Sequence, residues 1–203
     1  MTGEIGLMIK LFFLMLFAFL LGSIPVGVII AKTKGVDLKK VGSGNIGATN
    51  VLRSLGKFPA LLTLIGDVLK GSIAIIMGRY FEMGILYEGF IGLSAILGHN
   101  YSIFLGFKGG KGVATSMGVL LFYSPITAFI TFIIWVVVVI RTKYSSLGAL
   151  VSFLLLPIDI YIVDYSDEKL LVASLITVFI VIRHKNNIQR LMKGTERKIG
   201  QRA

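Results

Sequence analysis

The stretch LFFLMLFAFLLGSIPVGVIIA, residues 11–31, runs for 21 residues without a charged side chain. About 20 apolar residues in a helix are enough to cross the roughly 30 Å hydrocarbon core of a bilayer. Lys10 is the single basic residue before this run, whereas four lysines follow it between positions 32 and 40. Lys and Arg gather on the cytoplasmic side of membranes. The pattern therefore predicts a first membrane span with the N-terminus outside and the 32–57 loop in the cytoplasm. A cleaved signal peptide would have a shorter apolar region behind a basic stretch.

The composition of the 203-residue chain extends this interpretation to its whole length. Hydrophobic residues make up 55% and charged residues 15%, whereas soluble domains are about 25% charged. With no cysteine and only two histidines, neither a thiolate nor a His-rich metal site is expected, and we predict no metal and no cofactor. The net charge of +11 sits in short loops between apolar runs, which favours lipid or phosphate ligands over nucleic acid.

The remaining apolar runs predict six further crossings. Four of them cover residues 58–79, 84–107, 144–163 and 169–183. The uncharged stretch 113–140 has basic residues at both ends, so it should cross an even number of times. Pro125 disfavours helix at Ser124, which divides the stretch into two legs, and the first, at 112–123, is short. We predict an all-α, seven-span, N-out and C-in protein with one domain, 1–203. Seventeen of the 21 Lys and Arg residues then lie on the cytoplasmic side, together with only two acids, Asp37 and Glu196.

The segment VGSGNIGATNVLR, residues 41–53, matches the spacing G-x-G-x-x-G of a dinucleotide-binding turn. That turn needs a preceding strand, whereas VDLKKV before it is short and charged, and Asp67, at the position of the ribose-binding acid, lies inside an apolar run. Two interpretations remain. The glycines and Arg53 could form an anion-binding nest, or the segment could be a flexible linker that ends in a helix cap.

Two other loops favour the anion site. GFKGGKGVAT, residues 106–115, combines glycines with Lys108 and Lys111 before a short helix, and helix N-termini attract anions. In RHKNNIQRL, residues 183–191, helical spacing places Arg183, Asn187 and Arg190 on one face. All three loops fall on the predicted cytoplasmic side, which indicates a site for more than one phosphate group.

The residue inventory limits the chemistry of such a site. A covalent relay is not indicated, because the chain has no Cys and no evident Ser-His-acid arrangement. Neither His99 nor His184 is followed by Asp five positions later, so the His-x4-Asp signature of other glycerolipid acyltransferases is absent. A reactive anhydride donor would need mainly orientation and charge neutralisation.

Five motifs in order resemble the acyl-phosphate-dependent glycerol-3-phosphate acyltransferases of the PlsY type. They are GSIPVG (22–27), VGSGNIGATNVLR (41–53), GD..KG (66–71), GHNYSIFLGFKGGKGVAT (98–115) and RHKNNIQRLMKGTE (183–196). The resemblance covers essentially the whole chain. It implies a bacterial plasma (inner) membrane enzyme with its active site at the cytoplasmic face. Such an enzyme transfers a fatty acyl group from acyl phosphate to the 1-hydroxyl of sn-glycerol 3-phosphate, the first step of phospholipid synthesis, giving lysophosphatidic acid and inorganic phosphate. Its partners would be both substrates, membrane lipids and the enzyme that makes acyl phosphate.

The same motifs imply the site residues of this chain. The predicted catalytic residues are Ser43, Lys111 and His184. The predicted substrate-binding residues are Asn45, Arg53, Lys108, Gly109, Gly110, Ser146, Asn187 and Arg190. Lys111, with Ser43, would neutralise the leaving phosphate, while Arg53, His184 and Asn187 would position glycerol 3-phosphate. The general base stays open between His184, whose ordinary pKa is about 6.5, and an oxygen of a substrate phosphate.

Several alternatives stay open at this point. Asp67 and Lys70 form an i, i+3 pair within an apolar run; we favour a structural ion pair over a functional role, although charges inside membranes are often functional. We likewise favour a structural role for His99 and Asn100. A transporter of phosphorylated solutes would need midplane polar residues or repeats, which are not evident. An acyltransferase using acyl-CoA or acyl-carrier protein would lack its usual motif.

Overall fold

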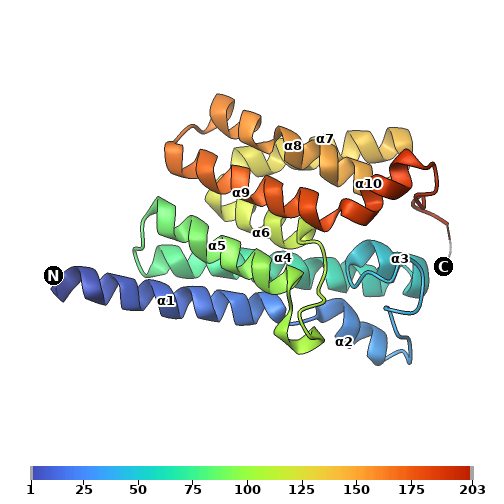
Figure 1. Cartoon of the computed structure of the whole chain (residues 1–203), viewed down its shortest axis with the longest axis horizontal. Coiled ribbons are helices and arrows are strands. Elements are labelled where there is room, and N and C mark those ends of the chain that lie inside the picture. The colour runs from blue at the N-terminus through green and yellow to red at the C-terminus, as the bar shows by residue number, and fades with distance from the viewer. Residues whose placement is uncertain (1, 202–203) are drawn as a thin grey trace.

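The computed structural model describes residues 2–201, which form helices and connecting loops without any strand. Figure 1 shows the long helices running roughly along one axis, with the N-terminus at one end and α3, α10 and the C-terminal segment at the other. The helices are α1 (Thr2–Ser23), α2 (Val26–Lys32), α3 (Ala48–Leu55), α4 (Lys57–Tyr80), α5 (Ile85–Asn100), the 3-10 helix η1 (Ile103–Leu105), α6 (Val113–Tyr123), α7 (Pro125–Thr142), α8 (Ser145–Val163), α9 (Asp167–Arg183) and α10 (Lys185–Met192).

Every apolar run predicted to cross the membrane contains an α-helix. The break predicted at residues 123–125 is confirmed, because α6 ends at Tyr123 and α7 begins at Pro125. Proline is favoured in the first turn of a helix, where its missing N–H would have no partner. Four helical segments are long and apolar enough to span a bilayer, namely Gly3–Lys32, Lys57–Tyr80, Pro125–Thr142 and Ser145–Val163. The helices α5, α6 and α9 are shorter, so the number of crossings and their orientation stay predictions.

The structure differs from the predicted boundaries at three places. The first run is interrupted at Ile24 and Pro25, which separate α1 from α2. The carbonyl of Ser23 at this interruption accepts a hydrogen bond from the Ser102 hydroxyl (2.5 Å), so the freed backbone group is satisfied. The third helix ends at Asn100 rather than at 107. The last helix does not stop at 183, since α10 continues it after a bend of 60°.

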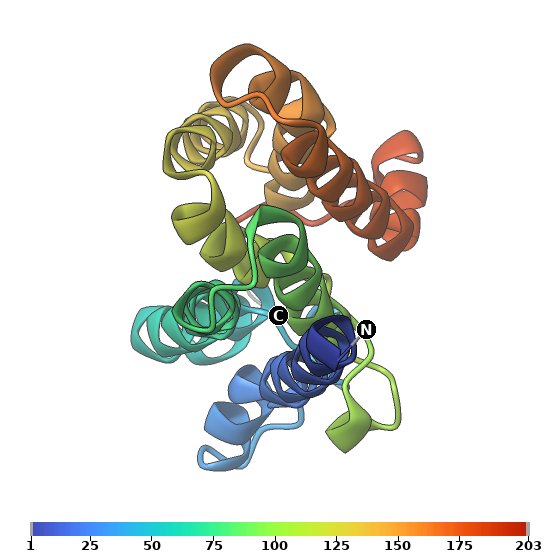
Figure 2. The same ribbon diagram turned by 90° about the vertical axis from the view of Figure 1, so that its left-hand side faces the viewer.

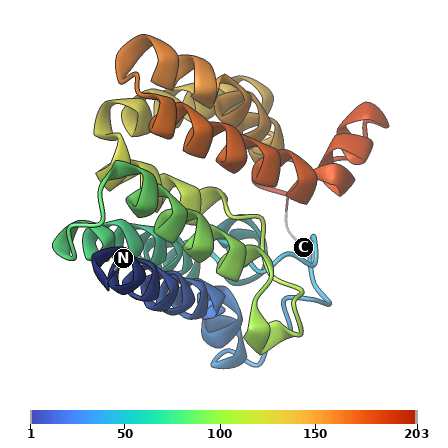
Figure 3. The same ribbon diagram turned by 60° about the vertical axis from the view of Figure 1, so that its left-hand side comes forward.

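The helices pack in two groups that α6 connects. In one group α1 lies along α5 and α4 packs against both, while in the other α8 packs between α7 and α9. Figures 2 and 3 show the two groups from the end and obliquely, with the segment around residue 115 between them. Close contact of α4 with α6 requires glycine, because a Cβ on Gly71 would collide with the carbonyl of Thr115, and one on Gly118 with that of Val68.

Candidate active site

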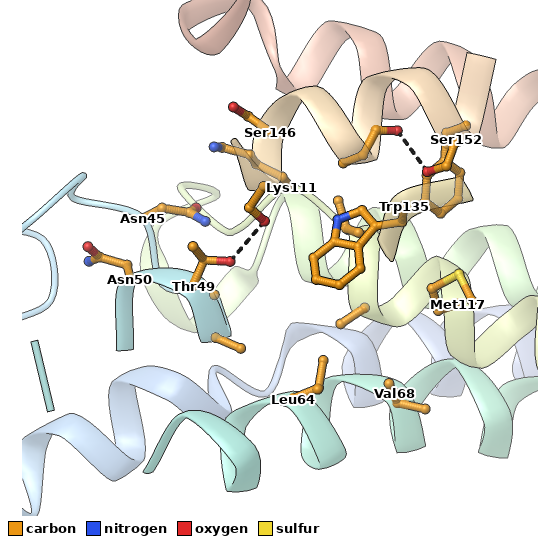
Figure 4. Close-up of a pocket in the computed structure, with 18 of the residues that line it drawn as sticks. Asn45, Thr49, Asn50, Leu64, Val68, Lys111, Met117, Trp135, Ser146 and Ser152 are labelled. Atoms are coloured by element: carbon orange, nitrogen blue, oxygen red, sulfur yellow. Dashed lines mark hydrogen bonds between the residues drawn. The ribbon is translucent and has the colours of Figure 1, made fainter. Parts of the chain in front are cut away.

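A cavity of about 580 Å³ lies where α3, α4, α6, α7 and α8 meet the junction of α9 and α10. Seven of the residues predicted for the site line it: Ser43, Asn45, Arg53, Lys111, Ser146, His184 and Asn187. They come from five separate parts of the chain, yet they gather at one end of the cavity, which we call the polar end. In Figure 4, Asn45, Lys111 and Ser146 lie together on one side of the view.

The rest of the cavity is lined by apolar side chains. Leu64 and Val68 on α4, Met117 on α6 and Trp135 on α7 lie on the other side of Figure 4. This apolar end continues along α6 and α7 as far as Leu121 and Pro125. One cavity thus offers both charged groups and a hydrocarbon surface.

The cavity also opens sideways between α4 and α7. Leu61 and Leu64 on α4, and Phe129 and Phe132 on α7, line the cavity and are nevertheless between 43% and 66% exposed. In a membrane protein, exposed apolar side chains on the membrane-spanning helices face lipid. The side opening therefore connects the apolar end to the bilayer.

The loop of the first motif is held by Asn50, which is almost fully buried. Its side-chain oxygen accepts the backbone N–H of Ser43 (2.8 Å), and its amide nitrogen donates to the carbonyls of Leu38 and Val41 (both 3.2 Å). Gly44 adopts a left-handed conformation with φ 70°, which glycine takes without strain. These contacts make Asn50 the scaffold that presents Ser43.

The glycine loop, residues 106–112, is fixed on both sides. The N–H groups of Gly109 and Gly110 donate to the carbonyls of Asn100 (3.2 Å) and His99 (2.9 Å), the last carbonyls of α5. These contacts end α5 at Asn100. The carbonyls of Gly109 and Gly110 accept hydrogen bonds from the guanidinium of Arg183 (3.1 and 3.0 Å). The N–H groups of Gly109 and Gly110 thus hold the loop against the end of α5. Direct contact of these two glycines with substrate stays a prediction.

Lys111 belongs to this loop and lines the polar end of the cavity. Burial is the main cause that lowers the pKa of Lys111 to about 8; Glu196 opposes the shift, whereas Arg190, Arg53 and Arg183 add to it. Gly112 caps α6 in a left-handed conformation, and the first N–H groups of a helix have no acceptor within it. The Lys111 ammonium and the N-terminus of α6 therefore lie close together, an arrangement that favours the binding of an anion.

His184 lies at the junction of α9 and α10 and is 2% exposed. Its Nδ1 is 2.8 Å from the carbonyl oxygen of Ile180. Because a carbonyl only accepts hydrogen bonds, Nδ1 carries the proton and Nε2 holds the free lone pair of the neutral ring. Burial, followed by the charge of Lys111, lowers the pKa of His184 to about 4.

Glu196 is a member of the site that the motifs did not assign. Its carboxylate accepts hydrogen bonds from Ser146, Asn187 and Arg190, each at 2.7 Å. Burial raises the pKa of Glu196, but these three hydrogen bonds outweigh it and hold the pKa below its ordinary value. One signal could have identified this residue, since it is one of only two acids on the predicted cytoplasmic side.

The backbone after Glu196 contacts the site as well. The guanidinium of Arg53 donates to the carbonyls of Arg197 (2.8 Å) and Lys198 (3.3 Å). Burial lowers the pKa of Arg53. The C-terminal segment thus lies across the polar end of the cavity and binds donors there.

Four predicted residues do not line the cavity, namely Lys108, Gly109, Gly110 and Arg190. Lys108 is exposed on the glycine loop. Arg190 lies behind the lining and reaches the site through its contact with Glu196. The structure therefore brings seven predicted side chains into the cavity, while the roles of Lys108 and Arg190 in substrate binding stay predictions.

Comparisons with known proteins agree with this geometry. The model of the family described as glycerol-3-phosphate acyltransferase matches residues 12–194. The chain is 46% identical to a glycerol-3-phosphate acyltransferase of Thermus thermophilus over 188 residues, which are 93% of this chain and 94% of that protein. It is 44% identical to the enzyme of the same name from Aquifex aeolicus over 190 residues, 93% of this chain and 99% of that protein.

Two solved structures share the fold. Crystal structures of PlsY, an integral membrane glycerol 3-phosphate acyltransferase, superpose with a TM-score of 0.89 in the glycerol 3-phosphate form and 0.87 in the lysophosphatidic acid form. Sequence identity is 44% and 42%, over 94% and 95% of this chain and 96% of each structure. The chain therefore belongs to the glycerol-3-phosphate acyltransferase family.

Proposed function

We propose that this protein transfers a fatty acyl group from acyl phosphate to the 1-hydroxyl of glycerol 3-phosphate, releasing lysophosphatidic acid and inorganic phosphate. One observation carries the proposal: the cationic polar end and the apolar end belong to a single cavity. A phosphorylated headgroup and an acyl chain can therefore bind in contact with each other. Family membership and the glycerol 3-phosphate and lysophosphatidic acid forms of the PlsY relative support the same substrates.

The polar end has the charge that two phosphates require. The cations Lys111 and Arg53 line it from different elements, together with the neutral donors Ser43 and Asn187. We assign Lys111, Ser43 and the N-terminus of α6 to the phosphate of the donor, because the acyl chain must continue from there along α6. Arg53, His184 and Asn187 then hold glycerol 3-phosphate on the opposite side.

In the transfer step the oxygen of the glycerol 1-hydroxyl forms a bond to the acyl carbon. The bond between that carbon and the phosphate oxygen breaks, and its electron pair leaves with the phosphate. Lys111 stabilises this developing charge. Fixed charges of this kind are strongest in sites that exclude water, as oxyanion holes show.

The hydroxyl proton has two acceptors within the site, Nε2 of His184 and a phosphate oxygen of a substrate. With a pKa of about 4, His184 is the weaker base, because phosphate monoesters have a second pKa of about 6. We therefore assign the proton to a phosphate oxygen and a positioning hydrogen bond to His184. Thr49 and Ser145, whose hydroxyls are 3.2 Å apart, join α3 to α8 beside this position.

The predicted membrane placement belongs to the same proposal. Seven crossings, with the N-terminus outside, put the polar end at the cytoplasmic face of the bacterial inner membrane, where glycerol 3-phosphate and the enzyme that makes acyl phosphate are found. The elements α3, α10 and the C-terminal segment, which contribute Arg53, Asn187 and Glu196 to the polar end, lie at one end of the helices (Figure 1), as this orientation requires.

Reconstitution tests the proposal. Purified protein in vesicles receives labelled glycerol 3-phosphate with either palmitoyl phosphate or palmitoyl-CoA, and lysophosphatidic acid is measured. We expect product from acyl phosphate alone. Product from acyl-CoA alone would contradict the assigned donor, and uptake of glycerol 3-phosphate without product would contradict acyl transfer altogether.

A further inference from the structure

A buried charge cluster connects α4 to α5 below the glycine loop. Asp67 and Lys70 are both nearly inaccessible, and the Lys70 ammonium donates to Oδ1 of Asp67 at 2.7 Å. Nδ1 of His99 lies 3.5 Å from the same oxygen. This nitrogen is buried and makes no hydrogen bond among residues 2–201, so the Asp67 carboxylate is the acceptor that faces it. Asp67 thus faces two cationic or donor groups, only one of which belongs to its own helix.

The far side of the His99 ring supports the glycine loop. A Cβ on Gly110 would collide with Nε2 of His99, so the imidazole lies directly against this glycine. The backbone carbonyl of His99 accepts the N–H of Gly110 at 2.9 Å. His99 therefore touches the loop through both its ring and its backbone, one residue before Lys111.

We propose that Asp67 and His99 are positioning residues. Asp67 fixes the orientation of the His99 ring, and the ring supports the glycine loop at Gly110. The position of the loop in turn determines where Lys111 lies in the cavity. The inference rests on the acyltransferase function proposed above. Arg183, which donates to the carbonyls of Gly109 and Gly110 from the other side, completes the frame around the loop. Lys70 balances the charge of Asp67 and does not contact the loop.

A purely structural ion pair behaves differently from a positioning pair. Replacing both members of a buried pair by apolar residues is often neutral, whereas removing one member leaves an uncompensated charge. The double variant Asp67→Leu/Lys70→Met removes both charges and keeps the branching of the first side chain and nearly the length of the second. It also removes the group that faces Nδ1 of His99. A structural pair would leave catalysis intact in this variant, and a positioning pair would not.

Steady-state kinetics of the full-length protein in vesicles provide the first test. We expect kcat of Asp67→Leu/Lys70→Met to fall about 10- to 100-fold, because a displacement of 1 Å can cost about 100-fold in rate. KM for glycerol 3-phosphate should change little, since Arg53 and Asn187 come from other elements. The control double variant Arg79→Met/Glu88→Gln removes an ion pair (3.3 Å) remote from the cavity and should keep wild-type kcat.

Wild-type kcat in Asp67→Leu/Lys70→Met would overturn the inference and leave a structural ion pair. Absence of product from the wild-type protein would instead contradict the proposed function, so the two failures are distinguishable.

A second measurement needs no substitution at Asp67. The chain has only two histidines, so ¹⁵N-histidine NMR of the protein in detergent gives two ring systems, which His184→Gln assigns. A carboxylate accepts but does not donate, so we expect Nδ1 of His99 to carry a proton at neutral pH. An unprotonated Nδ1 would overturn the inference even if the double variant does not fold.

Discussion

Ala128 on α7 lines the apolar end of the cavity. It is fully buried, and Pro125, about one helical turn closer to the start of α7, also lines the cavity. We predict that Ala128→Phe closes this last turn and changes the acyl-chain preference. One turn is about 5.4 Å long, and an extended chain advances about 1.2 Å per bond. The substitution therefore removes space for roughly four methylene groups.

The magnitude follows from hydrophobic transfer. Each buried methylene contributes about 0.8 kcal/mol, so four contribute about 3 kcal/mol, or roughly 200-fold in kcat/KM at 1.4 kcal/mol for each factor of ten. The assay is a competition between palmitoyl phosphate and lauroyl phosphate in one vesicle preparation, with both products measured by mass spectrometry. The preference for palmitoyl should fall by about this factor. A competition ratio is independent of how much protein is folded, which matters because overpacking also destabilises.

Ile126→Phe is the matched control, since Ile126 is on the same helix but is 62% exposed and does not line the cavity. It should leave the ratio unchanged. An unchanged ratio in Ala128→Phe, or an equal change in both variants, would refute the view that the acyl chain extends along α6 and α7 to Pro125.

Three further predictions concern the polar end. Because the pKa of Lys111 is about 8, the lysine loses its charge as pH rises through 8, and kcat/KM for acyl phosphate should fall in that range. Lys111→Arg should move this fall in the pH profile of kcat/KM to higher pH. A fall at the same pH in Lys111→Arg would exclude Lys111 as its source. Glu196→Gln loses the ionic contact with Arg190 and should destabilise by about 1–3 kcal/mol. The pKa of Glu196 is lowered in the folded protein. The ionised carboxylate therefore stabilises the fold fully above its ordinary pKa of 4.5, and this contribution is lost as pH falls below that value. The melting temperature of Glu196→Gln should lack the corresponding decrease at acid pH. Gly110→Ala drives a Cβ into the His99 ring and should lower kcat about 100-fold, and wild-type rates in this variant would show that the loop tolerates displacement.

Much of this fold could be predicted from local features of the sequence, namely charge distribution and proline. The uncharged stretch 113–140 had to be divided because both of its ends are basic, and Pro125 gave the position. The same charge bias placed three distant motifs on one side, and their side chains Arg53, Lys111 and His184 do line one cavity. Charge asymmetry and proline stereochemistry act within a few residues, which is why the sequence reveals them.

The missed features depend on contacts between distant segments. The bond from Ser146 to Glu196 joins residues 50 apart, and it exists only because the chain turns back after α10. The motifs imply substrate binding by Gly109 and Gly110, whereas the N–H groups of both glycines bind the end of α5. Likewise, the spacing of Asp67 and Lys70 predicted their ion pair, confirmed at 2.7 Å, but His99 joins it through tertiary packing.

The side opening between α4 and α7 has a consequence for kinetics. Leu61 and Phe129 on its two edges are exposed, and we predict that the acyl chain enters between them from the bilayer plane, so that the lipid substrate arrives by two-dimensional diffusion. Its effective concentration is then a mole fraction of the membrane rather than a molarity in water. Adding inert phospholipid at constant bulk acyl phosphate should slow the enzyme by surface dilution, whereas the dependence on glycerol 3-phosphate, which arrives from water, should not change.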